Sequence, residues 1–147
     1  MLIKFLKHTG AARKGQEADP DARRAIAYLL GAVVLKPRAA GGPRVPTRRA
    51  TKPIHISGEA WLVSRTCAAL PFQHRYASGV IAFDADDIDI AAWTQGDPAL
   101  RGMTDALMRD FEDTAFAGIP DEHRPEVLWN AHTDKGRLEL NFLFARV

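Results

Sequence analysis

The residues whose side chains could most clearly do chemistry lie at 127–147. There, two runs of alternating polar and apolar residues flank a Lys-Gly step at 135–136. Alternating residues on both sides of a glycine predict a β-hairpin. If residues 135–136 form its two-residue loop, His132 lies opposite Glu139, and Asn130 lies opposite Asn141. All four would share one face, because side chains alternate between the two faces of a strand. A slip of one residue would separate the imidazole from the carboxylate, so the prediction depends on this register.

This polar face has the donor atoms of a metal site. His132, Glu139 and Asn141 would supply one nitrogen and two or three oxygens, which suits Mg²⁺ or Mn²⁺ better than a structural zinc. Asp134 lies on the same face and is placed to hold the imidazole of His132 in one tautomer. The spacing by itself is not specific, and a face of hydrogen-bonded polar side chains without metal is the alternative.

A candidate nucleophile lies far upstream, in a helix that Asp19-Pro20 predicts to begin and Gly31 to end. On a helical wheel, Tyr28 lies nearly opposite the apolar stripe and close to Arg24, one turn earlier. A tyrosine in a helix usually packs into the core, whereas this position predicts an exposed one. A nearby cation stabilises a phenolate, so Tyr28 has the surroundings of a nucleophile. The stripe consists of Ala22, Ile26, Leu29, Leu30 and Val33.

The remaining elements must position these side chains. The pattern predicts one α+β domain, residues 1–147, in which an antiparallel sheet carries helices packed on one face. The sole cysteine, Cys67, favours a reducing compartment and an inert, packed thiol. No apolar stretch has the roughly 18 residues that a membrane helix needs. Besides the hairpin, strands are expected at 2–6 and 74–84, and helices at about 20–31, 57–70 and 98–116.

Positive charge gathers in the first third of the chain. Residues 1–55 contain twelve Lys and Arg against three Asp and Glu, whereas residues 56–147 contain eight against fifteen. The segment 36–53 contains six basic residues, no acidic one, several prolines and a Gly-Gly pair, which predicts a flexible basic loop. It could neutralise DNA phosphates, and a solvated linker is the alternative. The candidate DNA-binding residues are Arg24, Lys36, Arg38, Arg44, Arg48, Arg49, Lys52 and Arg137.

Three blocks of the sequence resemble a known family. They are YLLG at 28–31, RYASGVIAFD at 75–84 and VLWNAHTDKGRLELNFL at 127–143. The chain is similar in these blocks to the relaxases of small mobilisable bacterial plasmids, in the superfamily of HUH endonucleases. More narrowly, it resembles the variant in which His-Glu-Asn replaces three histidines. The matching positions are His132, Glu139 and Asn141, and the family's nucleophilic tyrosine maps to Tyr28.

The resemblance implies a function and a set of partners. Relaxases nick one strand of plasmid DNA at the origin of transfer. Their tyrosine attacks the scissile phosphate and stays linked to the 5′ end, so the strand can later be rejoined. The family fold is an antiparallel sheet that carries the metal ligands, with the tyrosine helix beside it. The implied partners are single-stranded DNA, accessory mobilisation proteins and a coupling protein, in the bacterial cytoplasm.

The resemblance also has limits. Relaxases of this family continue well beyond the signature strand, so we expect a fragment, a truncated relative or a compact member. The strand ending at 143–147 would then be an exposed edge. The basic segment has no counterpart in the resemblance. The alternative function is a truncated, non-catalytic module that binds single-stranded DNA, with Trp61 or Trp93 as stacking platforms.

Overall fold

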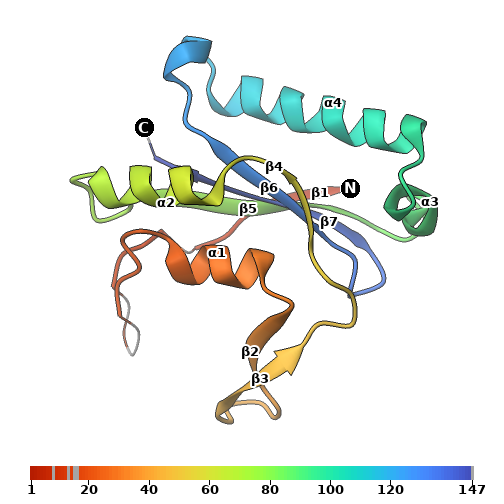
Figure 1. Ribbon diagram of the computed structural model, residues 1–147, viewed down its shortest axis with the longest axis horizontal. Helices are drawn as coiled ribbons and strands as arrows, with labels where there is room; N and C mark the ends of the chain where they lie inside the picture. The colour runs from red at the N-terminus through yellow and green to blue at the C-terminus, as the bar shows by residue number, and fades with distance from the viewer. Residues whose placement is uncertain (8, 13, 15–16, 147) are drawn as a thin grey trace.

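The computed structural model describes residues 1–7, 9–12, 14 and 17–146 and shows an α+β fold (Figure 1). The bounds of the strands and helices are β1 Leu2–Phe5, α1 Arg23–Leu30, β2 Val33–Pro37, β3 Arg44–Arg48, β4 Ile54–Ser57, α2 Ala60–Ala69, β5 Tyr76–Phe83, α3 Ile90–Thr94, α4 Pro98–Ala115, the 3₁₀ helix η1 Asp121–His123, β6 Val127–His132 and β7 Leu138–Ala145. Three consecutive strands separate α1 from α2, and the last two elements are strands.

Five strands form one antiparallel sheet in the order β1-β5-β7-β6-β4. The exposed edge predicted at 143–147 is wrong for residues 143–145, because β7 lies between β5 and β6 and all of its residues are buried, while Val147 lies outside the described residues. Leu143 pairs with Ser78, and Ala145 pairs with Tyr76. Since β5 matches β7 along its whole length, both sides of the signature strand are hydrogen-bonded within this chain.

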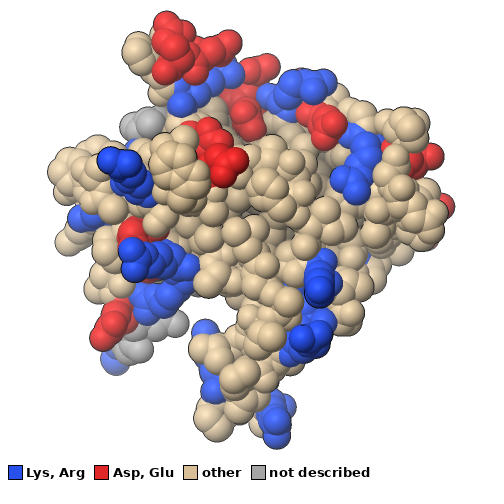
Figure 2. Space-filling model, viewed as in Figure 1, with Lys and Arg blue, Asp and Glu red and all other residues tan. Residues whose placement is uncertain are grey.

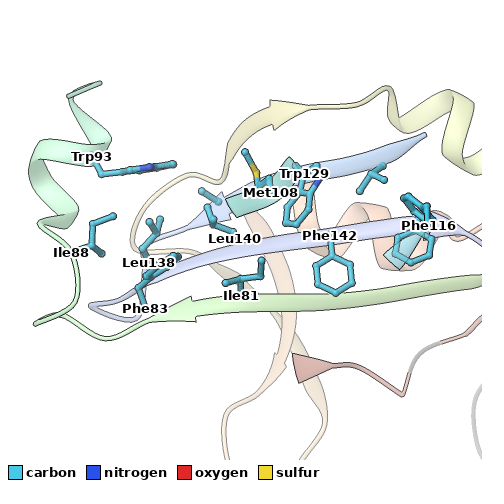
Figure 3. Packing of buried hydrophobic residues seen from close by; sticks show 13 residues of the cluster. Ile81, Phe83, Ile88, Trp93, Met108, Phe116, Trp129, Leu138, Leu140 and Phe142 are labelled. Carbon is cyan, nitrogen blue, oxygen red and sulfur yellow. The ribbon is translucent and has the colours of Figure 1, made fainter. Parts of the chain in front are cut away.

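Helices cover both faces of the sheet, whereas we expected them on one face only. The alternating apolar residues of β6 and β7 pack against α3 and α4 in a core around Trp129 and Phe142 (Figure 3). On the opposite face, Leu128, Leu143 and Ala145 pack against α1 and α2. The polar positions of the hairpin are therefore flanked by apolar ones on their own face, and this mixture allows α1 to cover them.

The basic segment is ordered as a hairpin, which corrects the expected flexible loop at 36–53. β2 and β3 form a separate two-stranded sheet that projects from the body of the molecule (Figure 1). Gly41 has a φ of 73° in the connecting turn, a conformation that glycine adopts without strain. Pro37 and Pro46 lie within the strands. A two-stranded sheet has two open edges, so residues without an N–H are tolerated there.

The helices agree in part with their predicted bounds. The prediction of α4 is confirmed, and Asp97 caps it by accepting a hydrogen bond from the N–H of Leu100. The helix α1 begins three residues later than Asp19-Pro20 suggested, although the Asp19 carboxylate still accepts bonds from two of its first N–H groups. Ser57 belongs to β4, a strand we did not predict, so α2 begins at Ala60. The strand predicted at 2–6 is present as β1, and its residues are exposed. No helix among the described residues has the length and apolar character to cross a membrane.

Candidate functional site

Tyr28 lies on the exposed side of α1, as the helical wheel predicted. Tyr28 is 43% exposed, whereas the neighbouring Leu29 is 4% exposed. The helix packs on the sheet face that carries His132, so residues from opposite ends of the chain meet there. The two rings lie with their centroids 6.3 Å apart at an interplanar angle of 71°. The structure therefore brings together the candidate nucleophile and the candidate metal ligand.

The predicted register of the hairpin is confirmed. His132 pairs with Glu139, and Asn130 pairs with Asn141. All four residues are buried, with exposures between 0% and 6%. The turn brings Arg137 to the Glu139 carboxylate, where its Nη2 lies 2.6 Å from Oε1. The polar face is thus a buried layer between the sheet and α1, and several of its side chains already bond to other groups of the protein.

The end of α1 is attached directly to this layer. The last four carbonyls of a helix have no partner within the helix and need one elsewhere. The carbonyl oxygen of Leu29 accepts a hydrogen bond from Nε2 of His132 at 2.7 Å and another from Nδ2 of Asn130. Two side chains of β6 therefore satisfy a carbonyl of the helix that carries Tyr28.

The imidazole of His132 is held in its neutral form. Burial lowers its pKa below the usual value, and the nearby guanidinium of Arg49 acts in the same direction. The hydrogen bond to the Leu29 carbonyl opposes this shift. Because a carbonyl only accepts hydrogen bonds, Nε2 carries the proton and Nδ1 keeps a lone pair. A neutral imidazole is the form that binds a metal ion.

Asp134 lies elsewhere than we expected. The Leu29 carbonyl, not this carboxylate, accepts the hydrogen bond from His132. The Asp134 Oδ2 lies 3.4 Å from Nη1 of Arg49, and both side chains are almost fully buried. Asp134 thus influences the imidazole by its charge, while its ion pair is with Arg49.

The three predicted ligands offer nitrogen and oxygen atoms of the kind that divalent ions bind, and they lie on one face of the hairpin. His132 and Glu139 are direct neighbours across β6 and β7, and Asn141 follows on the same face. Among the described residues, no three His, Cys, Asp or Glu are grouped so that they could hold a metal ion, so the expected set depends on the amide of Asn141. On this face, Oδ1 of Asn130 is buried and has no hydrogen-bond partner among the described residues. A buried oxygen of this kind calls for an ion or a water molecule.

A cavity of about 610 Å³ opens beside Tyr28, between α1, the β2–β3 hairpin and the N-terminal segment. Arg24, Lys36 and Arg44 line it, so three of the predicted DNA-binding residues share a cavity with the candidate nucleophile. The far end of the hairpin and its flanks carry exposed Arg38, Arg48 and Lys52, and exposed Arg137 lies in the β6–β7 turn. Figure 2 shows basic side chains without acidic ones over the projecting hairpin.

Two expected residues have a different environment. Arg49 is only 5% exposed and contacts the end of α1, so its guanidinium points into the protein. Trp93, expected as a stacking platform, is fully buried and donates a hydrogen bond to Thr104. Trp61 is 62% exposed and stays available on α2. Sequence reasoning did not assign Asn130 a role beyond its shared face, although its place opposite Asn141 was the available signal.

Comparison with known proteins adds an independent observation. The chain is similar to DNA relaxase MbeA of Escherichia coli, with 33% identity over 143 residues, which is 97% of this chain and 21% of that protein. It is also similar to cryptic plasmid protein C of Neisseria gonorrhoeae, with 36% identity over 76 residues, 52% of this chain and 31% of the relative. The matched part of the chain thus spans about a fifth of the length of the first relative and about a third of the length of the second. No family model matches it, and no solved structure does.

Proposed function

We propose that this chain is the nicking part of a plasmid mobilisation relaxase, which cuts and rejoins one DNA strand at a transfer origin. The main support is the contact between the ring of exposed Tyr28 and the ring of buried His132, which comes from the far end of the chain. The similarity to a protein named DNA relaxase extends over nearly the whole chain, so it includes both residues' surroundings. A fold of the HUH-endonuclease kind belongs to the same proposal.

The proposed reaction is a transesterification at Tyr28. The phenolate oxygen attacks the scissile phosphorus, a Tyr–O–P bond forms, and the P–O3′ bond breaks. The leaving 3′ oxygen takes up a proton from water and becomes a hydroxyl, while the 5′ phosphate stays on the tyrosine. Rejoining is the same step in reverse, so no nucleotide cofactor is needed.

The buried layer beneath Tyr28 would prepare the phosphate. We propose His132, Glu139 and Asn141 as ligands of a divalent ion, Mg²⁺ or Mn²⁺, which when bound polarises the phosphodiester. Glu139 would exchange its ion pair with Arg137 for this role. His132 is suited to it because burial keeps the imidazole neutral. Asp134 would adjust the charge around His132 from its buried position.

The basic residues would bind the DNA backbone. Those beside the cavity would hold the phosphates next to the scissile one, and those on the projecting hairpin would contact flanking DNA. The set is Arg24, Lys36, Arg38, Arg44, Arg48, Lys52 and Arg137. Accessory mobilisation proteins and a coupling protein are the proposed protein partners, and the bacterial cytoplasm is the proposed location.

Capture of the covalent adduct tests this function directly. The protein would be mixed with a random-sequence single-stranded DNA library labelled at the 3′ end, with Mn²⁺, and then denatured in SDS. We expect a labelled protein band that nuclease digestion removes, and recovered sequences that share a cleavage site. The same DNA labelled at the 5′ end should instead give a shorter free fragment with a 3′ hydroxyl.

Two variants assign the nucleophile. Tyr28→Phe should abolish the adduct and leave DNA affinity largely unchanged, whereas Tyr76→Phe, which alters the other tyrosine, should keep it. Nicking by Tyr28→Phe would refute the assignment. If the folded protein binds DNA in a salt-sensitive way, ignores divalent metal and forms no adduct, the non-catalytic DNA-binding module is the correct function.

A further inference from the structure

We propose that Arg49 is the positioning residue that fixes the direction of the Tyr28 side chain toward the scissile phosphate. This inference rests on the function proposed above for its catalytic consequence, while its structural consequence can be measured without DNA. Nothing in the sequence distinguishes Arg49 from the other basic residues of its segment. Its distinction is its place in the fold, just after β3 and beneath the end of α1.

Arg49 uses its whole guanidinium to hold the nucleophile's helix. Nη2 donates to the carbonyl oxygen of Tyr28 at 2.6 Å, and Nε donates to that of Gly31 at 3.1 Å. Nη1 reaches the Asp134 carboxylate at 3.4 Å. The side chain is 1% exposed, so these contacts form away from competing water. A planar fork with several N–H donors can make such bonds together, and a lysine ammonium cannot reproduce the geometry.

The helix α1 needs this support because it is short. It has eight residues, and helices of that length are not stable alone in water. Its last carbonyls also form the negative end of the helix dipole, where a cation is favourable. Arg49 donates a hydrogen bond to the carbonyl oxygen of Tyr28, and His132 donates one to the carbonyl oxygen of Leu29. Two consecutive carbonyls are therefore bound to two different parts of the fold.

The same guanidinium also contacts the tyrosine ring. The Cζ atom of Arg49 lies 4.8 Å from the centroid of the Tyr28 ring, within the range of a cation–π contact. His132 meets that ring edge to face. Backbone and ring are thus held by one residue, and Tyr28 also lines the cavity. A misplacement of the reacting group by about 1 Å can slow a reaction about a hundredfold. Fixing the position of Tyr28 therefore has a catalytic consequence.

Arg49 is itself fixed by the elements around it. Its N–H donates to the Ala32 carbonyl at 2.8 Å, just beyond α1. Asp134 supplies the only ion pair that Arg49 makes among the described residues. The β6–β7 turn therefore reaches Tyr28 through Arg49, which gives Asp134 a part in positioning the nucleophile as well.

Kinetics of adduct formation test the catalytic consequence. In Arg49→Lys, which keeps the charge, we expect the rate at saturating DNA to fall roughly tenfold to a hundredfold. The Kd for the same DNA should change less than about twofold, because the guanidinium faces the protein. Arg109→Lys, an exposed change on α4, serves as the matched control and should match the wild type. A weaker Kd with an unchanged rate would make Arg49 a DNA-binding residue and overturn the proposal.

Fluorine NMR tests the structural consequence without DNA. The protein contains two tyrosines, so 3-fluorotyrosine labelling gives two signals, and Tyr28→Phe assigns them. Arg49→Lys should move the Tyr28 signal toward that of free fluorotyrosine, whereas Arg109→Lys should leave it in place. Asp134→Asn, a milder change, should move it part of the way, and this second variant decides the case if Arg49→Lys does not fold. An unmoved signal in folded variants refutes the inference. If the signal moves but the wild type forms no adduct, only the proposed function fails.

Discussion

Nε2 of His132 lies 2.7 Å from the carbonyl oxygen of Leu29, and this single hydrogen bond joins residues 103 positions apart in the chain. It connects the predicted metal-binding hairpin to the helix that carries Tyr28. Placing the candidate nucleophile beside the candidate ligands therefore depends on the same buried contact that closes the end of α1. Stability and the proposed activity are coupled at this point, and the variants below are chosen to separate them.

The proposed metal site predicts a specific loss of affinity. Glu139→Gln keeps the shape of the side chain and removes its charge, so Mn²⁺ binding should weaken by at least about tenfold. Calorimetric titration of the folded protein with Mn²⁺ measures this. Glu122→Gln, on the exposed 3₁₀ helix, changes the net charge equally and should have no effect. Equal affinities in the two variants would contradict the assignment of Glu139.

Burial of His132 predicts a dependence of stability on pH. Its pKa is lowered in the folded protein, so on acidification the unfolded chain binds a proton before the folded one does. This contribution to the free energy of unfolding is present above the ordinary histidine pKa of about 6.5 and is lost as the pH falls below it. His132→Gln has no such titration, so its stability difference from the wild type should shrink between about pH 7 and pH 5. Urea unfolding at both values measures the difference, and a constant gap would contradict the prediction.

Gly79 lies on β5, between β1 and β7, where we expect an added methyl group to clash. A Cβ there would lie 2.3 Å from the ring of Phe142 and 2.5 Å from the Lys4 carbonyl oxygen. Gly79→Ala should therefore reduce the free energy of unfolding by about 1–3 kcal/mol or more. Gly102, inside α4, has open space around its Cα, and Gly102→Ala should stabilise by about 0.5–1 kcal/mol. Urea unfolding should therefore give changes of opposite sign in the free energy of unfolding for the two variants. An unchanged free energy in Gly79→Ala would show that the strands can separate there.

Cys67 should be unreactive while the protein is folded. Burial raises its pKa to about 11, and the negative charges of Asp19 and Asp21 add to this effect. Since the thiolate is the reactive form, a disulfide reagent at about pH 8 should modify the native thiol far more slowly than the urea-unfolded one. Absorbance of the released thiol follows the reaction. Rapid modification of the native protein would place Cys67 near the surface.

The sequence predicted the parts of the fold that depend on local periodicity. The register of the β6–β7 hairpin, the exposure of Tyr28 and the helix beginning at Pro98 all follow from alternation, a helical wheel and a cap. These features require no knowledge of which elements meet. They carry most of the candidate site, because the four polar residues of the hairpin face lie within one supersecondary unit.

The remaining features depend on contacts between distant segments. Pro and Gly in 36–53 indicated a loop, yet in a two-stranded sheet with open edges they are compatible with strands. The buried position of Arg49 follows from the approach of α1 and the β6–β7 turn, so composition could not separate it from exposed Arg48. Likewise, only the pairing of β5 with β7 shows that the signature strand is central.

The central place of β7 has a consequence for synthesis on the ribosome. Tyr28 and its helix leave the exit tunnel more than a hundred residues before β7, the strand on which the sheet depends. Until then β5 has no partner on one side, and the carbonyls at the end of α1 have no histidine to meet. Until β6 and β7 have emerged, Tyr28 therefore lacks the hairpin residues that surround it in the folded protein. Long-range pairing of this kind folds slowly, so the proposed site would be completed only late in synthesis.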